Sequence, residues 1–396
     1  MRLWYKTSEC RTLTEVLTFY SPPTMISRNI LPFAIAATTQ LLNYDGLVFS
    51  SPITSSSAAT ATPFTPVGGL GTNSTPPVYA PLSDFDFQSL NLGLNQEYIE
   101  LDLFHHGLAQ FSTNEFRQAG FSDDDLYLIE FMADQEVGHA KVLTDILGPN
   151  AAKQCDYQYP FTTVPEFIDF CQKLTRFGES GTYGFIEHLD SRPSAQILLQ
   201  SISTEARQQL IFRQFEGLFP MPVWHETGIT QSMQWTLLAP YLKSCPAENP
   251  RIVFQIFPDL NITNNPNATE LSLSPAISNN VSSLSKPGRI LELSWDNPGK
   301  VAGYNDSYTT NTTAGTAKFA AWISQLNVTY TDLNLTSSNT ATTVQPGGTL
   351  YGNGSAPIVN GTMFIVITDS NPFLTPFNIS MINQHIVAGP ALYQAD

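Results

Sequence analysis

The sequence predicts an α+β protein in two parts: a bundle of four long helices with a shorter fifth helix over residues 84–250, and a β-rich region over residues 251–396. Apolar residues recur with helical period between residues 86 and 245, which is typical of amphipathic helices. Beyond residue 250, short runs of β-branched and aromatic residues alternate with Asn, Gly, Pro and Ser. That alternation is typical of strands joined by turns.

The N-terminal part is expected to lie outside both regions. Met25 begins a segment in which Arg28 precedes a short apolar run, the pattern of a secretory signal peptide. We therefore predict that residues 1–24 are not part of the mature protein and that residues 25–53 are the signal region. A buried N-terminal helix is the alternative. Residues 54–83 are rich in Ser, Thr and Pro, which predicts a flexible linker.

Start and stop signals separate the predicted helices. The second helix begins with the capping pattern of Ser122 and Asp125 and ends at Gly148. Gly178 and Gly181 lie inside the third helix, where each costs about 1 kcal/mol relative to Ala, so we expect them to permit close packing.

The first helix carries an apolar stripe from Leu90 to Phe111, and the fourth follows Pro193 with a stripe that ends at Phe215. The third is predicted over about 165–189 and the fifth near 229–242.

Ionisable residues occupy core positions on these helices. Glu97 lies on the apolar stripe of the first helix, Glu136 and His139 on that of the second, and Glu205 on that of the fourth. A buried carboxylate costs several kcal/mol unless it is paired or bound to metal. Bundles that bind two iron or manganese ions take a Glu from each of two helices and Glu-x-x-His from each of the other two. Glu97 and the Glu136/His139 pair match the first half of that scheme.

The second half of the scheme is incomplete. Gln208 stands three residues after Glu205, where a His is expected, and Gln replaces imidazole poorly at a transition-metal site. The third helix offers Glu179 and Glu187, neither of which falls on its apolar stripe. The candidate ligands are therefore Glu97, Glu136, His139 and Glu205, with Gln208 and Glu179 as further candidates, for iron or manganese in preference to zinc.

The β-rich region is expected to have the size of a sandwich domain. Strands are predicted over residues 251–257, 289–295, 319–333 and 362–369, with a helix as the alternative at the start of the third run. The region also carries ten Asn-X-Ser/Thr acceptors for N-linked glycans, and Asn73 precedes them in the linker. The ten are Asn261, Asn267, Asn280, Asn305, Asn311, Asn327, Asn334, Asn353, Asn360 and Asn378.

These acceptors and the signal pattern together predict secretion to the extracellular space or the cell wall. In that oxidising setting we expect one disulfide, between Cys155 and Cys245, and a buried thiol at Cys171. The formal net charge of −16 excludes nucleic acid as a partner. No stretch after the signal region is apolar and long enough for a transmembrane helix.

The helical region resembles a known family. The runs LNQEYIELDLFHHGL, EFMADQEVGHAKVL and GESGTYGFIEHLDSRPSAQILLQSISTEARQQLIFRQFEGLFPMPVW, and the tail PFNISMINQHIVAGPALYQAD, are similar to those of fungal ferritin-like proteins described as stress-response or sexual-development proteins, relatives of plant desiccation-related proteins. The resemblance implies a ferritin-like bundle and no established reaction. In metal-binding relatives such as rubrerythrins, a ligand Glu precedes an aromatic residue by seven positions. Glu97 and Phe104 fit, but Arg176 stands seven before Tyr183.

Three functions remain open on this basis. The first is a secreted glycoprotein linked to stress or development, in which the acidic cluster and Arg176 form a buried ionic network with no reaction. The second is an oxidase or peroxide-removing protein, a metal-dependent oxidoreductase with one or two metal ions. The third is a structural cell-wall glycoprotein that binds polysaccharide, through Trp295 and Trp322, or a protein partner.

Overall fold

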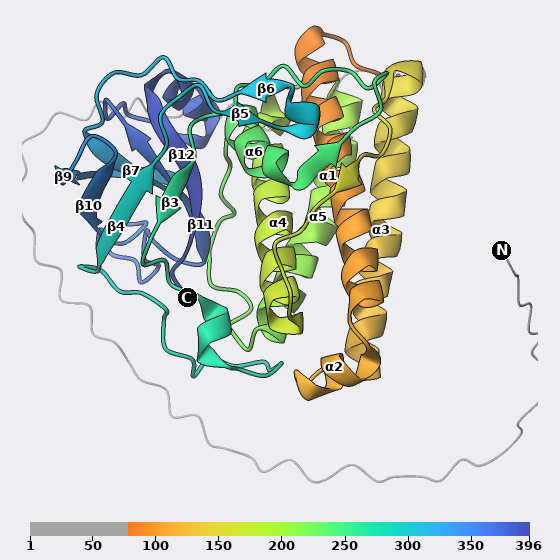
Figure 1. Cartoon of the computed structure of the whole chain (residues 1–396), viewed down its shortest axis with the longest axis horizontal. Coiled ribbons are helices and arrows are strands. Elements are labelled where there is room, and N and C mark those ends of the chain that lie inside the picture. Colours follow the sequence, from red (N-terminus) through yellow and green to blue (C-terminus); the bar gives the residue numbers. More distant parts are fainter. Residues whose placement is uncertain (1–77) are drawn as a thin grey trace, which may run out of the picture. The chain divides into compact units, whose positions relative to one another are not determined.

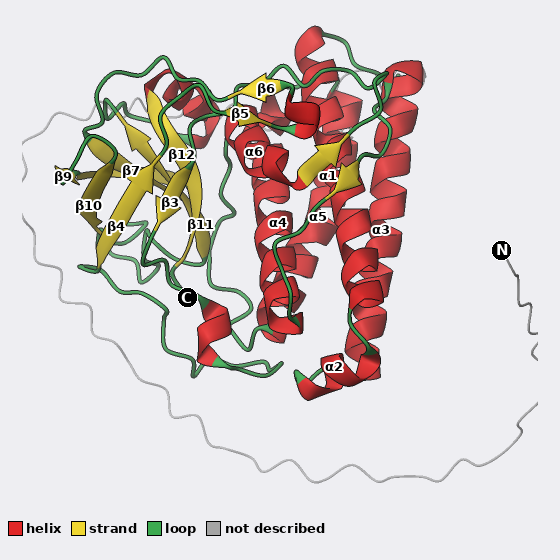
Figure 2. Cartoon of the chain, viewed as in Figure 1, coloured by secondary structure: helices red, strands yellow, loops and turns green. Residues whose placement is uncertain are grey.

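The computed structural model describes residues 78–396, which belong to one compact unit. Residues 1–24, the predicted signal region and most of the predicted linker, with Asn73, lie outside the described residues. Helices gather on one side of this unit and strands on the other, as Figures 1 and 2 show. The α+β class predicted from the sequence is confirmed.

The helical half contains the four long helices predicted. Ser122 caps the second of them by accepting a hydrogen bond from the Asp125 backbone, and the Asp125 carboxylate accepts one from the Ser122 backbone. Two shorter helices accompany the bundle, and Pro240 lies just beyond the end of the last of them, which is shorter than predicted. The helices are α1 (Asp84–Gln110), α2 (Thr113–Gln118), α3 (Asp123–Leu147), α4 (Val164–Phe185), α5 (Arg192–Phe215) and α6 (Gln231–Leu238).

Helix α4 is buried on almost every side, because α1, α5 and α6 all pack against it. Its two glycines permit this approach, as predicted. A Cβ atom on Gly178 would lie 2.5 Å from the Gln96 side chain of α1. One on Gly181 would lie 2.1 Å from the Gln234 side chain of α6.

The N-terminal part of α4 keeps a polar side, where Glu166 is exposed and Asp169 and Lys173 are half-buried. Arg176 and Glu179 lie farther along, where the helix is enclosed, and both are buried.

The β-rich half consists mainly of two four-stranded antiparallel sheets. Their facing side chains form one apolar core that includes Trp295, Trp322, Ile365 and Tyr393. The first sheet has the order β3 (Leu260–Ile262), β4 (Ile290–Trp295), β10 (Thr340–Val344) and β9 (Asn334–Leu335). The second has the order β12 (Ile386–Gln394), β11 (Thr362–Thr368), β7 (Phe319–Ser324) and β8 (Asn327–Asp332).

Strand β11 is buried on both faces and joins the two halves of the molecule. Ile365 and Ile367 face the core between the sheets, whereas Phe364 and Val366 belong to the core shared with the bundle. Gln172 of α4 donates a hydrogen bond of 2.8 Å to the Thr362 hydroxyl at the start of this strand. The uninterrupted apolar run of β11 follows from these two buried faces.

Two of the predicted strand runs differ from a single strand in the structure. Residues 251–257 form no strand, so that prediction was wrong. The run is apolar because Ile252, Ile256 and Phe257 pack into the bundle core, and side-chain hydroxyls bind its backbone instead of a partner strand. Residues 319–333 form the β7–β8 hairpin, which excludes the helical alternative.

Short strand pairs and a disulfide tie the connecting segments together. Strand β1 (Asp156–Tyr157) pairs with β2 (Leu242–Ser244), and Cys155 forms a disulfide with Cys245 beside this pair. Cys171 is a buried free thiol. A second pair joins β5 (Val301–Ala302) to β6 (Tyr308–Thr309). Within residues 78–396, no helix has the length and apolarity needed to cross a membrane.

Candidate metal centre

Three helices bring four potential ligands to one point inside the bundle. Helix α1 supplies Glu97, α3 supplies Glu136 and His139, and α5 supplies Glu205. One potential ligand atom from each of the four lies within 4.8 Å of those of the other three. The three carboxylic acids are buried and His139 is half-buried. The positions follow from the helical period, because Glu136 and His139 are three residues apart and share one face.

The His139 imidazole is at the centre of this cluster. Its Nδ1 atom lies 2.9 Å from Glu136 Oε2, 3.3 Å from Glu97 Oε2 and 3.7 Å from Glu205 Oε1. Its Nε2 atom lies 3.1 Å from the Thr204 hydroxyl oxygen. That hydroxyl donates its own hydrogen to the Ser201 carbonyl at 2.7 Å, so it accepts from Nε2–H. The imidazole is thereby oriented with Nδ1 toward the carboxylates, which is how a second group commonly orients a metal-binding histidine.

Gln208 contacts the cluster through its amide nitrogen. This nitrogen donates a hydrogen bond of 2.6 Å to Glu136 Oε1 and one of 3.2 Å to Gln135 Oε1. The residue that replaces the expected histidine therefore holds Glu136 in position. Its amide oxygen is buried and, among residues 78–396, has no hydrogen-bond partner.

A fourth acid, Glu100, belongs to the same cluster and was not predicted. It is fully buried one helical turn after Glu97, and Gln96 donates a hydrogen bond of 2.8 Å to its Oε1 atom. Its other carboxylate oxygen has no partner in the described part of the chain. The spacing of three residues from Glu97 was the available signal, because such residues share a helix face.

The cluster contains more acid than its one base can neutralise. Burial raises the pKa of Glu97 to about 7. Burial and the neighbouring acids raise the pKa values of Glu100 and Glu205 well above the ordinary range. Burial lowers the pKa of His139, but its contacts with Glu136 and Glu97 outweigh this and raise it to about 12. Fully ionised, four carboxylates and one imidazolium leave three uncompensated negative charges, which a bound cation or protons must balance.

The donor set fits a divalent transition-metal ion. Imidazole nitrogen and carboxylate oxygen are the ligands that iron and manganese accept in bundles of this kind. Glu100 Oε2 is buried without a hydrogen-bond partner among residues 78–396. Buried oxygens of this kind are costly unless a ligand satisfies them.

Glu179, the remaining candidate ligand, is engaged elsewhere. It is fully buried, contrary to its expected position off the stripe, because this part of α4 is enclosed by its neighbouring elements. The Arg176 guanidinium lies 3.5 Å from Glu179 and donates a short hydrogen bond to Glu226 of the loop before α6. Burial raises the pKa of Glu179 to about 8, although Arg176 opposes the shift. Glu226, fifty positions from Arg176, offered no signal in the sequence.

Other residues singled out in the sequence lie away from the cluster. Glu187 is exposed at the end of α4. Trp295 and Trp322 are buried between the two sheets and present no ring face for stacking on a sugar. The polysaccharide interpretation of these two residues was therefore wrong.

Comparisons with known proteins place the cluster in context. The family described as "Ferritin-like domain" matches residues 85–218, which include α1 to α5 and every residue of the cluster. "Protein rds1" of Schizosaccharomyces pombe is 52% identical over 346 residues, which cover 84% of this chain and 86% of that protein. The similarity therefore extends through the β-rich half as well as the bundle.

Proposed function

Because the chain belongs to the fungal ferritin-like protein family, we propose that it binds a single divalent metal ion, iron or manganese, in the acidic cluster between α1, α3 and α5. The observation that carries this proposal is the convergence of four ligand atoms within 4.8 Å in a buried site with excess negative charge. Glu97, Glu136, His139 and Glu205 would hold the ion. Gln208 and Thr204 would orient Glu136 and His139.

We favour one ion over two because the second half of the expected ligand set is either substituted or engaged elsewhere. Arg176 occupies the part of α4 where the resemblance implies a further ligand, and Glu179 is already paired with it. Gln208 uses its nitrogen on Glu136, so it supplies a positioning contact. The second half of a dinuclear site therefore has no free ligand on α4 and no imidazole on α5.

Metal analysis of the untagged full chain tests this proposal. We expect a single ion per chain in the wild type and an affinity more than about 10-fold lower in Glu136→Gln. Glu130→Gln is the matched control, since Glu130 is an exposed acid on the same helix. Metal content that Glu136→Gln leaves unchanged would contradict the proposal and favour a metal-free ionic network.

Iron or manganese bound here would supply one-electron redox chemistry toward dioxygen or peroxide. The role of the chain is to hold the ion in a buried site, and the proton on His139 Nδ1 would be released to solvent when metal binds. Oxidase or peroxide-removing activity is therefore the reaction class that we propose to test in the metal-loaded protein. Activity that is equal in Glu136→Gln would exclude this centre as its source.

We propose that the chain is exported and N-glycosylated. The disulfide between Cys155 and Cys245 supports an oxidising compartment, where such bonds persist. Six acceptor residues have exposed positions and four are half-buried. The exposed six are Asn261, Asn280, Asn305, Asn311, Asn334 and Asn353, and the half-buried four are Asn267, Asn327, Asn360 and Asn378.

Glycopeptide mapping of protein from its fungal host checks this proposal. We expect occupied sites among the exposed acceptors, and an unmodified Asn360, whose amide nitrogen donates a hydrogen bond to the Pro222 carbonyl. A chain recovered from the cell interior without glycans would contradict export.

We propose a role in stress response or development, as the family resemblance implies. A deletion strain complemented with either the wild type or Glu136→Gln separates metal-dependent from metal-independent functions. We expect the wild type to restore growth under oxidative or metal stress and Glu136→Gln not to. Equal rescue by both would assign the role to the scaffold and its glycans.

A further inference from the structure

Two exposed aromatic rings lie where the loop between α5 and α6 meets the loop between β10 and β11. Trp224 is 55% exposed and Tyr351 is 49% exposed, whereas tryptophan side chains are on average highly buried. Their ring centroids are 6.2 Å apart, with an angle of 40° between the ring planes. Among residues 78–396, the other tryptophans are all buried. Trp224 and Tyr351, the aromatic pair, therefore form a surface that is open to solvent.

Gln325 holds the two loops together beneath the aromatic pair. Its side-chain oxygen accepts a hydrogen bond of 2.9 Å from the Trp224 backbone, and its side-chain nitrogen donates one of 2.9 Å to the Pro357 carbonyl. The Nε2 atom of His225 also lies 3.0 Å from the Tyr351 hydroxyl oxygen. Because Gln325 is buried, the exposed position of the two rings is fixed by the fold.

Tyr351 begins a turn that contains an acceptor for an N-linked glycan. The Gly354 backbone donates a hydrogen bond of 2.8 Å to the Tyr351 carbonyl, which closes a four-residue turn with Asn353 at its third position. The Leu350 backbone donates another of 2.8 Å to the Ala356 carbonyl, so both ends of the loop are tied together. Asn353 itself is exposed and begins an Asn-X-Ser acceptor.

Asn353 is the one acceptor of the ten in the β-rich region that has an aromatic residue two positions before it. Two residues of chain span at most about 7 Å, so the first sugar of a glycan on Asn353 is within reach of the Tyr351 ring. The faces of a pyranose ring present C–H groups whose partial positive charge matches the negative face of an aromatic ring. A glycan at this position is bulky and would also obstruct a protein partner from these rings.

We propose that the aromatic pair binds the first N-acetylglucosamine of the chain's own glycan on Asn353. This rests on the proposed export and glycosylation, and it adds a binding site on the protein for one particular glycan. A sugar stacked on the rings is less accessible to enzymes, and it shields the Trp224 indole from small solutes. A separate polysaccharide or a protein bound to these rings would leave the Asn353 glycan free in solvent.

Timed digestion of the native secreted protein with an endoglycosidase that cuts the glycan core tests this proposal. We expect cleavage at Asn353 to be about 5-fold slower in the wild type than in Tyr351→Leu, since the stacked sugar must leave the rings before the enzyme acts. Cleavage at Asn280, an exposed acceptor with no aromatic residue within five positions, should be equal in the two proteins. Tyr127→Leu is the matched control, because Tyr127 is 65% exposed on a helix without an acceptor, and it should leave the rate at Asn353 unchanged.

Acrylamide quenching of tryptophan fluorescence is a second measurement that leaves both rings in place. We expect stronger quenching in Asn353→Gln, which lacks the glycan, than in the glycosylated wild type. The difference should be lost when Trp224→Leu is added to both proteins, because Trp224 is the exposed tryptophan of the described residues.

Two results would overturn the binding site and leave glycosylation intact. They are equal cleavage rates at a glycosylated Asn353 in the wild type and Tyr351→Leu, and equal quenching of the wild type and Asn353→Gln. Glycans on other acceptors with none on Asn353 would also overturn this proposal alone. A chain recovered without any glycan would overturn it together with the proposed export.

Discussion

The metal-free protein is expected to lose several kcal/mol of unfolding free energy as pH rises from about 5 to about 8. The pKa of Glu97 is raised to about 7 and that of Glu179 to about 8, from 4.5 in an unfolded chain. Between these limits the native state holds protons that the unfolded state has released. For Glu97 the difference corresponds to roughly 3 kcal/mol.

The sign is the same for His139. Its pKa is raised from 6.5 to about 12, so the stability it contributes is fully present below 6.5 and declines as pH rises toward 12. A divalent ion replaces these protons with its own charge. The metal-loaded protein is therefore expected to lose less stability across the same pH range, and the remaining loss is the part that Glu179 contributes outside the cluster.

Denaturant unfolding with a chelator or with excess manganese, at several pH values between 5 and 8, measures both effects. Glu97→Gln should flatten the profile of the metal-free protein, and Glu130→Gln should leave it unchanged. A metal-free protein whose stability is constant or rises over this range would show that the cluster does not hold these protons.

Arg176→Met is expected to lower the free energy of unfolding by about 3–5 kcal/mol, because it leaves Glu179 buried beside Glu226 without a counter-charge. Arg176 and Glu179 are 3% and 0% exposed, so water compensates little. The cost should be largest near pH 8 and smaller near pH 5, where Glu179 is protonated in the native state.

Thermal and denaturant unfolding compare this variant with two others. Arg117→Met removes a similar ion pair, that of Arg117 with Asp123 at 2.9 Å, whose side chains are 58% and 69% exposed. It should cost less than about 1 kcal/mol. Arg176→Met combined with Glu179→Gln should recover most of the loss. A cost for Arg176→Met that is no larger than for Arg117→Met would show that the buried network does not need the guanidinium.

The candidate cluster could be predicted because the spacing of residues along a helix determines which face of the helix each one occupies. Glu97, Glu136, His139 and Glu205 lie on apolar stripes, and the structure places them together. The same rule failed for Glu179. A stripe identifies the buried face only where the other face meets solvent, and the part of α4 around Glu179 has no such face.

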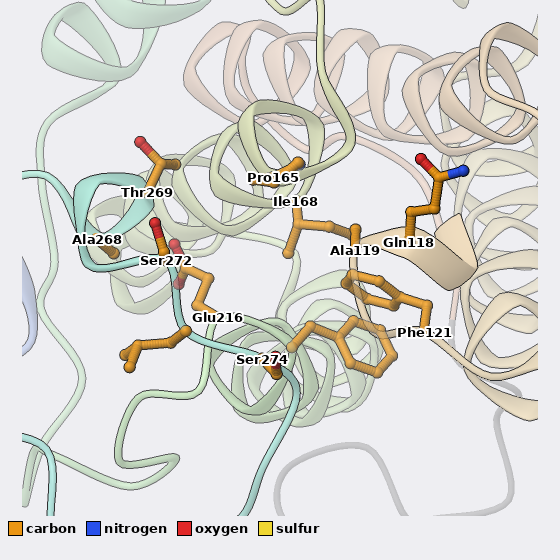
Figure 3. Close-up of a pocket in the computed structure, with 12 residues that line it drawn as sticks. Gln118, Ala119, Phe121, Pro165, Ile168, Glu216, Ala268, Thr269, Ser272 and Ser274 are labelled. Carbon is orange, nitrogen blue, oxygen red and sulfur yellow. The ribbon is translucent and has the colours of Figure 1, made fainter. Parts of the chain in front are cut away.

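Interactions between residues close in sequence account for much of the fold. Hydrophobic periodicity, turn residues and intrinsic propensities predict the four long helices, their caps, the β7–β8 hairpin and the apolar strand β11. The burial of Glu179, the Arg176–Glu226 pair, the absence of a strand over 251–257 and the cavity between α2, α4, the end of α5 and residues 268–274 (Figure 3) depend on segments far apart in the chain. These features are decided by tertiary packing around α4 and α5. Burial and charge pairing act between residues far apart in the sequence, so they leave no periodic pattern in it.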